Sequence, residues 1–198
     1  MFDDFNYNDK VGFKHIIDGK VMFIEFADVK LDNFAQCCEF ERMYKKYIDE
    51  LSQYDDNNEK YVPYSWKKDA EEYPNVIVTR FLLHKVKSYP IMKEEIIPIG
   101  FIMSQESYDT DIFYISQFYI EPEYRRKQIG STIAELFTNI KGKERKILYH
   151  VCMRNETAEA FWKKVMKECQ MQDDKDTCED YESFPGYTKY VKTKRGRK

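Results

Sequence analysis

The chain has 198 residues, of which 42% are hydrophobic and 34% are charged, and its formal net charge is −3. These values are typical of a globular domain whose core needs no disulfide or metal, so we interpret residues 1–198 as a single domain. The negative net charge argues against a nucleic-acid partner, because binding to phosphate backbones requires a basic surplus.

The N-terminal residues lack the basic and apolar regions of a signal peptide, and no apolar run approaches the ~20 residues of a membrane span. The five cysteines include no CxxC pair, and no histidine stands at metal-ligand spacing. We therefore expect a cytoplasmic protein with unpaired thiols, no bound metal and no membrane contact. The basic run 192–198 is expected to be a flexible, solvated tail.

Residues 14–26 have the pattern of a β-hairpin, because two β-rich runs flank an Asp-Gly pair that tolerates a tight turn. A long helix is predicted next, with Asp32 as its N-cap and apolar residues recurring at helical spacing to about Tyr54. A shorter helix is predicted over 65–72.

The second part of the chain alternates between apolar β-type runs and amphipathic segments. Three strands are predicted to form an antiparallel meander, followed by a helix, a strand, a second helix, and one or two strands broken at a Pro-Gly pair. The predicted ranges are 76–86, 96–104 and 112–120 for the meander, then 128–143, 146–153, 155–169 and 178–192. This order indicates an α/β fold of the α+β type, in which helices flank a mixed, mostly antiparallel central sheet.

The stretch 115–131 combines the features of an anion-binding turn. Strand pairing must stop at Pro122, which has no N–H to donate, and a basic turn at 125–127 then leads into a helix. The first N–H groups of a helix have no internal partner and attract phosphate, and Gly130 lets the backbone approach a ligand closely. A charged turn that binds nothing is the alternative interpretation of the same residues.

This stretch resembles motif A of the GNAT superfamily of N-acetyltransferases, in which a strand ending in V-x-P is followed by Q/R-x-x-G-x-G/A. Residues 120–122 correspond to V-x-P, Arg125 to the Q/R position and Gly130 to the second glycine. Gln128 replaces the first glycine. Because the family uses backbone amides at this position, the resemblance implies that the replacement is tolerated.

The stretch 150–162 resembles motif B of the same family, in which a strand leads into N-x-x-A-x-x-F-Y. Asn155, Ala158 and Phe161 match, and Trp162 stands where many members have tyrosine. Asn155 is also expected to cap the helix. Two motifs in the right order make the resemblance specific, and it covers about residues 76–191, with an N-terminal hairpin and helices before them.

The resemblance implies that acetyl-CoA is the cosubstrate and binds where the fourth and fifth strands of the family fold splay apart. Backbone groups of the fourth strand would pair with the pantetheine arm, amides of the following loop would hold the pyrophosphate, and Asn155 would lie near the thioester. The expected cofactor contacts are Phe118, Tyr119, Ile120, Arg125, Arg126, Lys127, Gln128, Ile129, Gly130, Ser131, Asn155 and Phe161.

The resemblance also implies direct attack of a primary amine on the thioester, through a tetrahedral intermediate stabilised by a backbone N–H near Tyr119. Trp162 occupies the position of the family's general acid, so the thiolate leaves either unassisted, which we favour, or with help from Tyr187. The general base that deprotonates the amine is not assigned to one residue. The candidates are the carboxylates Glu106, Asp109 and Asp111, or a water chain beside Ser116 and Gln117. His15, His84 and His150 are interpreted as structural or exposed, not as catalytic.

The predicted function is therefore acetyl transfer to a small-molecule or peptide amine, and a homodimer is left open. The alternative is a non-catalytic sensor of acyl-CoA, which the departures at Gln128 and Trp162 favour. A role in protein or nucleic-acid interaction through the basic tail is disfavoured by the net charge. Acidic clusters such as 69–72 and 173–174 would favour a cationic acceptor if one of them bordered the acceptor cleft.

Overall fold

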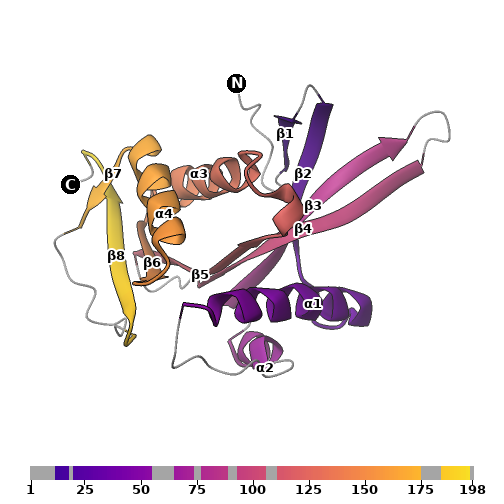
Figure 1. Cartoon of the computed structure of the whole chain (residues 1–198), viewed down its shortest axis with the longest axis horizontal. Coiled ribbons are helices and arrows are strands. Elements are labelled where there is room, and N and C mark those ends of the chain that lie inside the picture. Colours follow the sequence, from indigo (N-terminus) through magenta and orange to yellow (C-terminus); the bar gives the residue numbers. More distant parts are fainter. Residues whose placement is uncertain are drawn as a thin grey trace.

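The computed structural model describes residues 12–17, 20–54, 65–73, 77–88, 93–105, 111–174 and 184–196. Within these residues the chain forms one eight-stranded sheet, in the order β1-β2-β3-β4-β5-β6-β8-β7, with helices on both faces (Figure 1). The strands are β1 (Gly12–Ile17), β2 (Lys20–Asp28), β3 (Ile77–Ser88), β4 (Lys93–Gln105), β5 (Ile112–Ile120), β6 (Lys146–Cys152), β7 (Met171–Asp173) and β8 (Tyr187–Lys194), and the helices are α1 (Phe34–Leu51), α2 (Ser65–Glu72), a short 3-10 helix η1 (Pro122–Tyr124), α3 (Ile129–Lys141) and α4 (Glu156–Glu168).

The predicted fold is confirmed, including the hairpin of β1 and β2 and the antiparallel meander of β3, β4 and β5. The Asp-Gly turn of the hairpin lies outside the described residues. The predicted N-cap of α1 is wrong by one residue. Asn33, not Asp32, caps the helix, because Asn33 has extended backbone angles and its side chain accepts a hydrogen bond from the Gln36 N–H at 3.1 Å.

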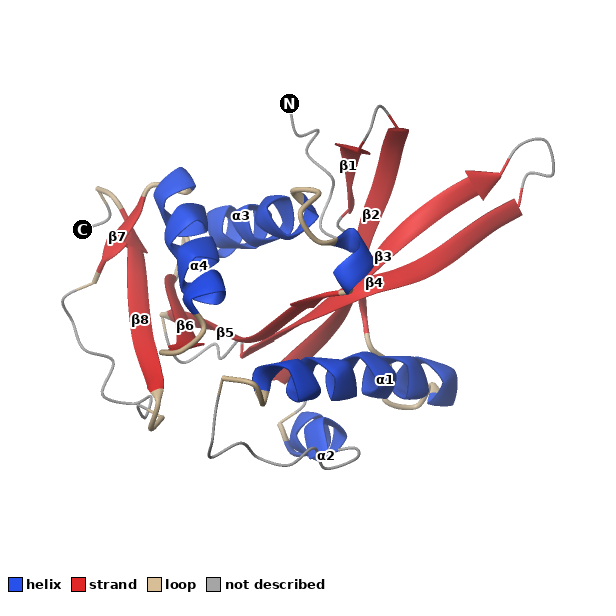
Figure 2. Ribbon diagram, viewed as in Figure 1, coloured by secondary structure: helices blue, strands red, loops and turns tan. Residues whose placement is uncertain are grey.

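The helices cover the two faces of the sheet in pairs, with α1 and α2 on one face and α3 and α4 on the other (Figure 2). Under α1 and α2, Phe40 packs against Trp66 and Phe101, with ring centroids 4.3 and 4.8 Å away. Under α3 and α4, the core contains Ile133 and Val165, both fully buried. Two separate cores therefore hold the sheet from opposite sides.

No described helix is both long and apolar enough to cross a membrane.

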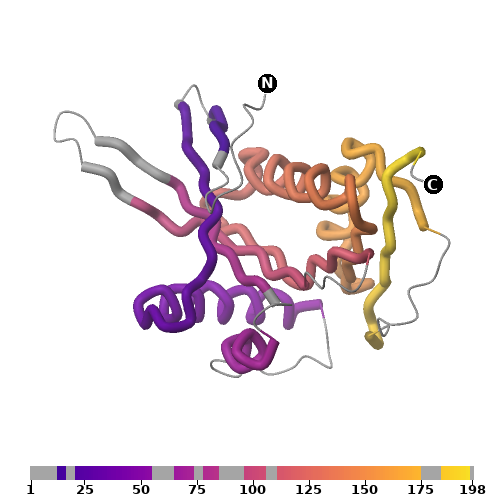
Figure 3. The backbone as a smooth tube through the Cα atoms, turned by 180° about the vertical axis from the view of Figure 1, so that it is seen from behind, coloured from indigo at the N-terminus to yellow at the C-terminus, as the bar shows by residue number. Residues whose placement is uncertain are grey.

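The C-terminal part differs from the prediction in one strand. β7 was not predicted, because its three residues carry too little pattern to be recognised, and it pairs antiparallel with the end of β8. Lys192 and Lys194, expected to begin a flexible tail, therefore lie in β8, where Lys194 Nζ donates to the Cys169 carbonyl oxygen at 2.6 Å. The N-terminal strands and β8 lie at opposite ends of the sheet (Figure 3).

Candidate active site

A cleft of about 990 Å³ opens where β5 separates from β6. It is lined by α1 and the turn after it, by β5 and β6, by the loop that leads into α3, by the first turns of α3 and α4, and by β8. β5 pairs with β6 in parallel at residues 112–115, and the remainder of β5 forms one wall of the cleft. The topology therefore leaves a gap in the middle of the sheet.

Ser116 explains why β5 changes course at this point. Met103 pairs with Gln117 and Ser104 with Ile115, so Ser116 is an extra residue in the strand, and its hydroxyl donates to the Met103 carbonyl oxygen at 3.1 Å. Such a β-bulge bends a strand and shifts the alternation of its side chains. After the bulge, residues 118 and 120 face the core under α3 and α4, whereas residue 119 faces α1.

The loop between β5 and α3 presents backbone amides to the cleft. Arg126 and Gln128 both have left-handed backbone angles, with φ of 58° and 62°, which turn the chain sharply before α3 begins. The Thr132 N–H donates to the Gln128 carbonyl oxygen at 3.0 Å, so the amides of residues 129–131 precede the first hydrogen bond of the helix. His15 Nε2 contacts the Lys127 carbonyl oxygen at 2.9 Å and holds the loop against β1.

The left-handed angle of Gln128 leads to a stability prediction. This conformation costs a non-glycine residue ~1–2 kcal/mol, and glycine loses ~0.5–1 kcal/mol through its greater freedom in the unfolded chain. We expect Gln128→Gly to raise the free energy of unfolding by up to about 1 kcal/mol, measured by urea denaturation. The matched control is Lys127→Gly, which gains no such relief and should lower it. Equal losses in both variants would contradict the prediction.

Gly130 leaves space between aromatic rings beside these amides. A Cβ added to it would lie 3.5 Å from Ile120 Cγ1, 3.7 Å from Phe161 Cε2 and 3.9 Å from Phe118 Cε1. Phe118 and Phe161 stack with their centroids 5.9 Å apart. A side chain at residue 130 would therefore point toward Ile120 and these two rings, all of which line the cleft.

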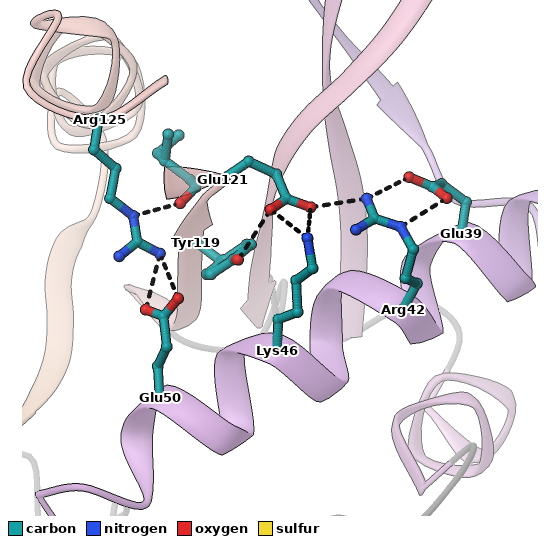
Figure 4. A network of polar contacts seen from close by, with 8 residues as sticks. Glu39, Arg42, Lys46, Glu50, Tyr119, Glu121 and Arg125 are labelled. Carbon is teal, nitrogen blue, oxygen red and sulfur yellow. Dashed lines mark hydrogen bonds and ion pairs between the residues drawn. The ribbon is translucent and has the colours of Figure 1, made fainter. Parts of the chain in front are cut away.

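A buried carboxylate fastens the end of β5 to α1. Glu121 is 2% exposed and accepts hydrogen bonds from Lys46 Nζ at 3.0 and 3.2 Å and from the Tyr119 hydroxyl at 3.2 Å, and Arg42 lies 2.8 Å away (Figure 4). Burial opposes ionisation, but the hydrogen bonds and charges of Lys46 and Arg42 outweigh it, so the pKa of Glu121 lies below its usual value. The network holds α1 in place over β5.

The side chain of Arg125 also connects the end of β5 to α1. Its Nε donates to the Ile120 carbonyl oxygen at 2.7 Å, its Nη2 donates to both carboxylate oxygens of Glu50 at 2.8 and 3.0 Å, and its guanidinium lies over the Tyr119 ring (Figure 4). Cofactor binding by Arg125 stays a prediction; Arg125 lines the cleft, and its charge is paired with Glu50 of α1. The pair ties the amide-bearing loop to the helix on the opposite wall.

The second motif lies where the prediction placed it, at the start of α4. Asn155 caps the helix, with its side-chain oxygen accepting from the Ala158 N–H at 2.9 Å. Phe161 stacks against Phe118, and both rings line the cleft. Trp162 is 8% exposed and stacks on Tyr149 at 5.1 Å. Trp162 therefore belongs mainly to the core while its edge lines the cleft.

Most of the predicted site residues come together in this cleft. The lining includes Phe118, Tyr119, Ile120, Arg125, Arg126, Gln128, Gly130, Ser131, Asn155, Phe161, Trp162 and Tyr187. Lys127 and Ile129 are not among the lining residues, because Ile129 is fully buried in the core and the Lys127 ammonium lies over Tyr124. Of the carboxylates considered as bases, Asp111 is exposed and lies 4.0 Å from the Lys146 ammonium, and Glu106 and Asp109 lie outside the described residues.

The sequence analysis missed the wall opposite the amide-bearing loop. Tyrosines of α1 line this wall, and His150 of β6 joins them with its Nδ1 3.1 Å from the Tyr114 hydroxyl. The helical spacing of Tyr44 and Tyr47 predicted an apolar helix face, but not that part of this face borders a cleft. His150 was interpreted as structural, and the structure places it in the lining.

A sheet that opens between β5 and β6, with an amide-bearing loop at the opening, defines an acetyltransferase fold. The family comparison agrees: the model of the acetyltransferase (GNAT) family matches residues 40–166. The chain belongs to this family. A search of curated proteins finds no match to the chain.

Solved structures with the same fold come from distant relatives. Spermidine N-acetyltransferase from Vibrio cholerae, in complex with CoA and spermine, is 15% identical, and the match covers 85% of this chain and 92% of that chain with a TM-score of 0.53. PaiA N-acetyltransferase from Thermoplasma acidophilum, in complex with coenzyme A, is 12% identical over 86% and 98%, also with a TM-score of 0.53. Tetrahymena GCN5 is 8% identical over 85% and 94%, with a TM-score of 0.52. At these identities the likeness establishes the fold.

Proposed function

We propose that the protein transfers an acetyl group from acetyl-CoA to a primary amine. The observation that carries this proposal is one continuous cleft that joins the amides at the start of α3 to the opening between β5 and β6. Similar structures from Vibrio cholerae and Thermoplasma acidophilum contain CoA, which supports the choice of cosubstrate.

The residues of the cleft fit this cosubstrate. The amides at the start of α3, where Gly130 and Ser131 line the cleft together with Arg126, suit a pyrophosphate, because the start of a helix favours negative charge. The part of β5 after the bulge does not pair with β6, so its backbone groups are available to the pantetheine arm of acetyl-CoA. The Phe118 and Phe161 rings would border the path of this arm. When bound, the thioester supplies an activated acyl carbon. The backbone N–H near Tyr119 stays the predicted oxyanion donor.

His150 is the best-placed proton acceptor among the described residues that line the cleft. Glu50, their one carboxylate, is held by Arg125, and the Cys152 thiol donates to the Tyr54 carbonyl oxygen at 3.1 Å. An imidazole changes charge near neutral pH, as an acceptor of an ammonium proton must. In the proposed reaction the amine nitrogen bonds to the acyl carbon, its proton passes to His150, and the carbon–sulfur bond breaks.

The departing thiolate needs little help, which leads to a prediction about Trp162 and Tyr187. An indole N–H is not a titrating acid, and a thiol with a pKa near ~8.5 is a good leaving group. We expect Trp162→Phe and Tyr187→Phe each to lower kcat by less than about 10-fold. Steady-state rates on the best amine found measure both changes. A loss of about 1,000-fold in Tyr187→Phe alone, with KM for acetyl-CoA unchanged, would show that this hydroxyl is the general acid.

Two measurements on the purified chain test the proposed function. Calorimetric titration with acetyl-CoA measures binding, and the release of free thiol in the presence of a panel of primary amines measures transfer. We expect binding, and thiol release that depends on the amine with the acetylated amine as product. Binding without transfer to any amine would favour the alternative role as an acyl-CoA sensor, and no binding would refute both.

A further inference from the structure

The end of the cleft between α1 and β8 is built from aromatic rings that arrive from separate elements. We call this end the tyrosine wall and define it by Tyr44 and Tyr47 of α1, Tyr54 just after α1, Tyr114 of β5 and Tyr187 of β8, all of which line the cleft. Cys152 pairs with Tyr187 in the sheet and donates to the Tyr54 carbonyl oxygen, so β6 connects the two ends of the wall.

The ring contacts fall into two groups. On the α1 side, the Tyr47 ring lies 6.3 Å from the Tyr44 ring and meets the Tyr119 ring edge-on at 6.1 Å. On the β6 side, the His150 ring meets Tyr114 edge-on at 5.4 Å and Phe184 at 5.1 Å. All of these residues line the same cleft, so aromatic rings make up much of this part of its lining.

Three tyrosines of the wall influence the ionisation of a fourth, Tyr47. Burial raises the pKa of Tyr47, and the neighbouring Tyr187, Tyr44 and Tyr114 raise it further. The Tyr47 hydroxyl therefore stays protonated at neutral pH and can orient a ligand by hydrogen bonds, but it does not supply negative charge.

Within the part of the chain that the structure describes, the wall offers no unpaired carboxylate as counter-ion to a polycation. Among the described lining residues Glu50 is the one carboxylate, and Arg125 binds both of its oxygens. Those acidic residues of the sequence analysis that the structure describes lie outside the cleft. Residues 69–72 belong to α2, Asp173 pairs with Lys192, and none of these residues lines the cleft.

We propose that the acceptor is a small primary amine carried on a short alkyl chain from an aromatic ring. This inference rests on the proposed function and names the substrate class of the same cleft. Aromatic rings pack favourably edge-to-face and offset against one another, and ring faces attract an ammonium group before it loses its proton. The acceptor ring would lie among Tyr44, Tyr47 and Tyr114, with the amine directed toward His150.

The experiment compares acceptors that are matched except for one property. After calorimetry has established acetyl-CoA binding, thiol release is measured with 2-phenylethylamine, with 2-cyclohexylethylamine, which has the same reach but no aromatic ring, with spermidine, and with an alanyl peptide. We expect kcat/KM for 2-phenylethylamine to exceed that for 2-cyclohexylethylamine by about 5- to 10-fold, as an aromatic contact allows, and to exceed the other two by more.

Three variants then test whether the tyrosine wall causes the preference for the aromatic acceptor. Tyr47→Leu should bring the ratio of phenyl to cyclohexyl acceptor close to one, while Tyr47→Phe, which keeps the ring, should retain it. Tyr73→Leu removes a half-exposed tyrosine outside the cleft lining and should leave the ratio unchanged. Thermal melting and the affinity for acetyl-CoA, measured on each variant, show whether the fold is intact. If Tyr47→Leu does not fold, Tyr114→Leu provides the same comparison.

The outcomes separate this inference from the proposed function. Equal or better turnover of spermidine, the alanyl peptide or the cyclohexyl amine would overturn the aromatic acceptor and leave acetyl transfer to amines standing. Binding of acetyl-CoA without thiol release on any amine would overturn both. An aromatic preference that survives in Tyr47→Leu and Tyr114→Leu would overturn the role of the tyrosine wall.

Discussion

A Gly130→Val variant is expected to bind acetyl-CoA roughly 100-fold more weakly than the wild-type protein, with its fold intact. The first atom of a side chain fits at this position, because a Cβ would make ordinary contacts of 3.5–3.9 Å with Ile120, Phe161 and Phe118. The two methyl groups of valine extend further toward these side chains, and we expect the resulting displacement of the start of α3 to hold a phosphate away from the amides. Each hydrogen bond to a charged group contributes ~1.5–3 kcal/mol, so the loss of one or two accounts for this effect.

Calorimetry with acetyl-CoA, together with thermal melting, measures the effect of Gly130→Val. Gly130→Ala is the matched control, because it adds the Cβ alone and should weaken binding by less than about 10-fold. A valine variant that folds and binds acetyl-CoA as tightly as the wild-type protein would show that the loop before α3 is not the cofactor site. The proposed function would then lose its main support.

Local sequence patterns predicted most of the elements and one side of the cleft. Apolar periodicity identified α2 at its observed bounds and β5 at its observed bounds, because these segments bury one face or both. The two motifs located the amide-bearing loop and the Asn155 cap, because both depend on residues close together in the chain. β7 escaped recognition because a three-residue strand is stabilised by its partner β8, not by its own pattern.

The opposite wall of the cleft depends on contacts between distant residues, and no local pattern reports them. The motif predicts that Arg125 contacts the cofactor, but it does not predict the ion pair with Glu50, which is 75 residues away in the chain. Likewise, the position of α1 depends on the buried Glu121 carboxylate, which Lys46 and Arg42 neutralise. Because α1 carries two of the wall's tyrosines, the shape of the acceptor end follows from how this network holds the helix against β5.

His150→Gln is expected to lower kcat by roughly 100-fold or more, without changing the affinity for acetyl-CoA, because a general base contributes about 10²–10⁴-fold. Glutamine is the informative replacement, since its amide can keep a hydrogen bond to the Tyr114 hydroxyl but cannot accept a proton. The loss should be smaller at high pH, where more of the acceptor amine is already neutral. His84→Gln is the matched control, because His84 is not among the described residues that line the cleft.

The measurements are steady-state rates across pH and the calorimetric affinity for acetyl-CoA, made on both histidine variants. If His150 is the base, its variant loses rate most strongly at low pH, and His84→Gln follows the wild-type profile. A kcat within about 3-fold of wild type in His150→Gln would show that the ammonium proton leaves by another route. The water chain beside Ser116 and Gln117 would then become the leading candidate, because both residues line the cleft at the bulge of β5, just beyond its last pair with β6.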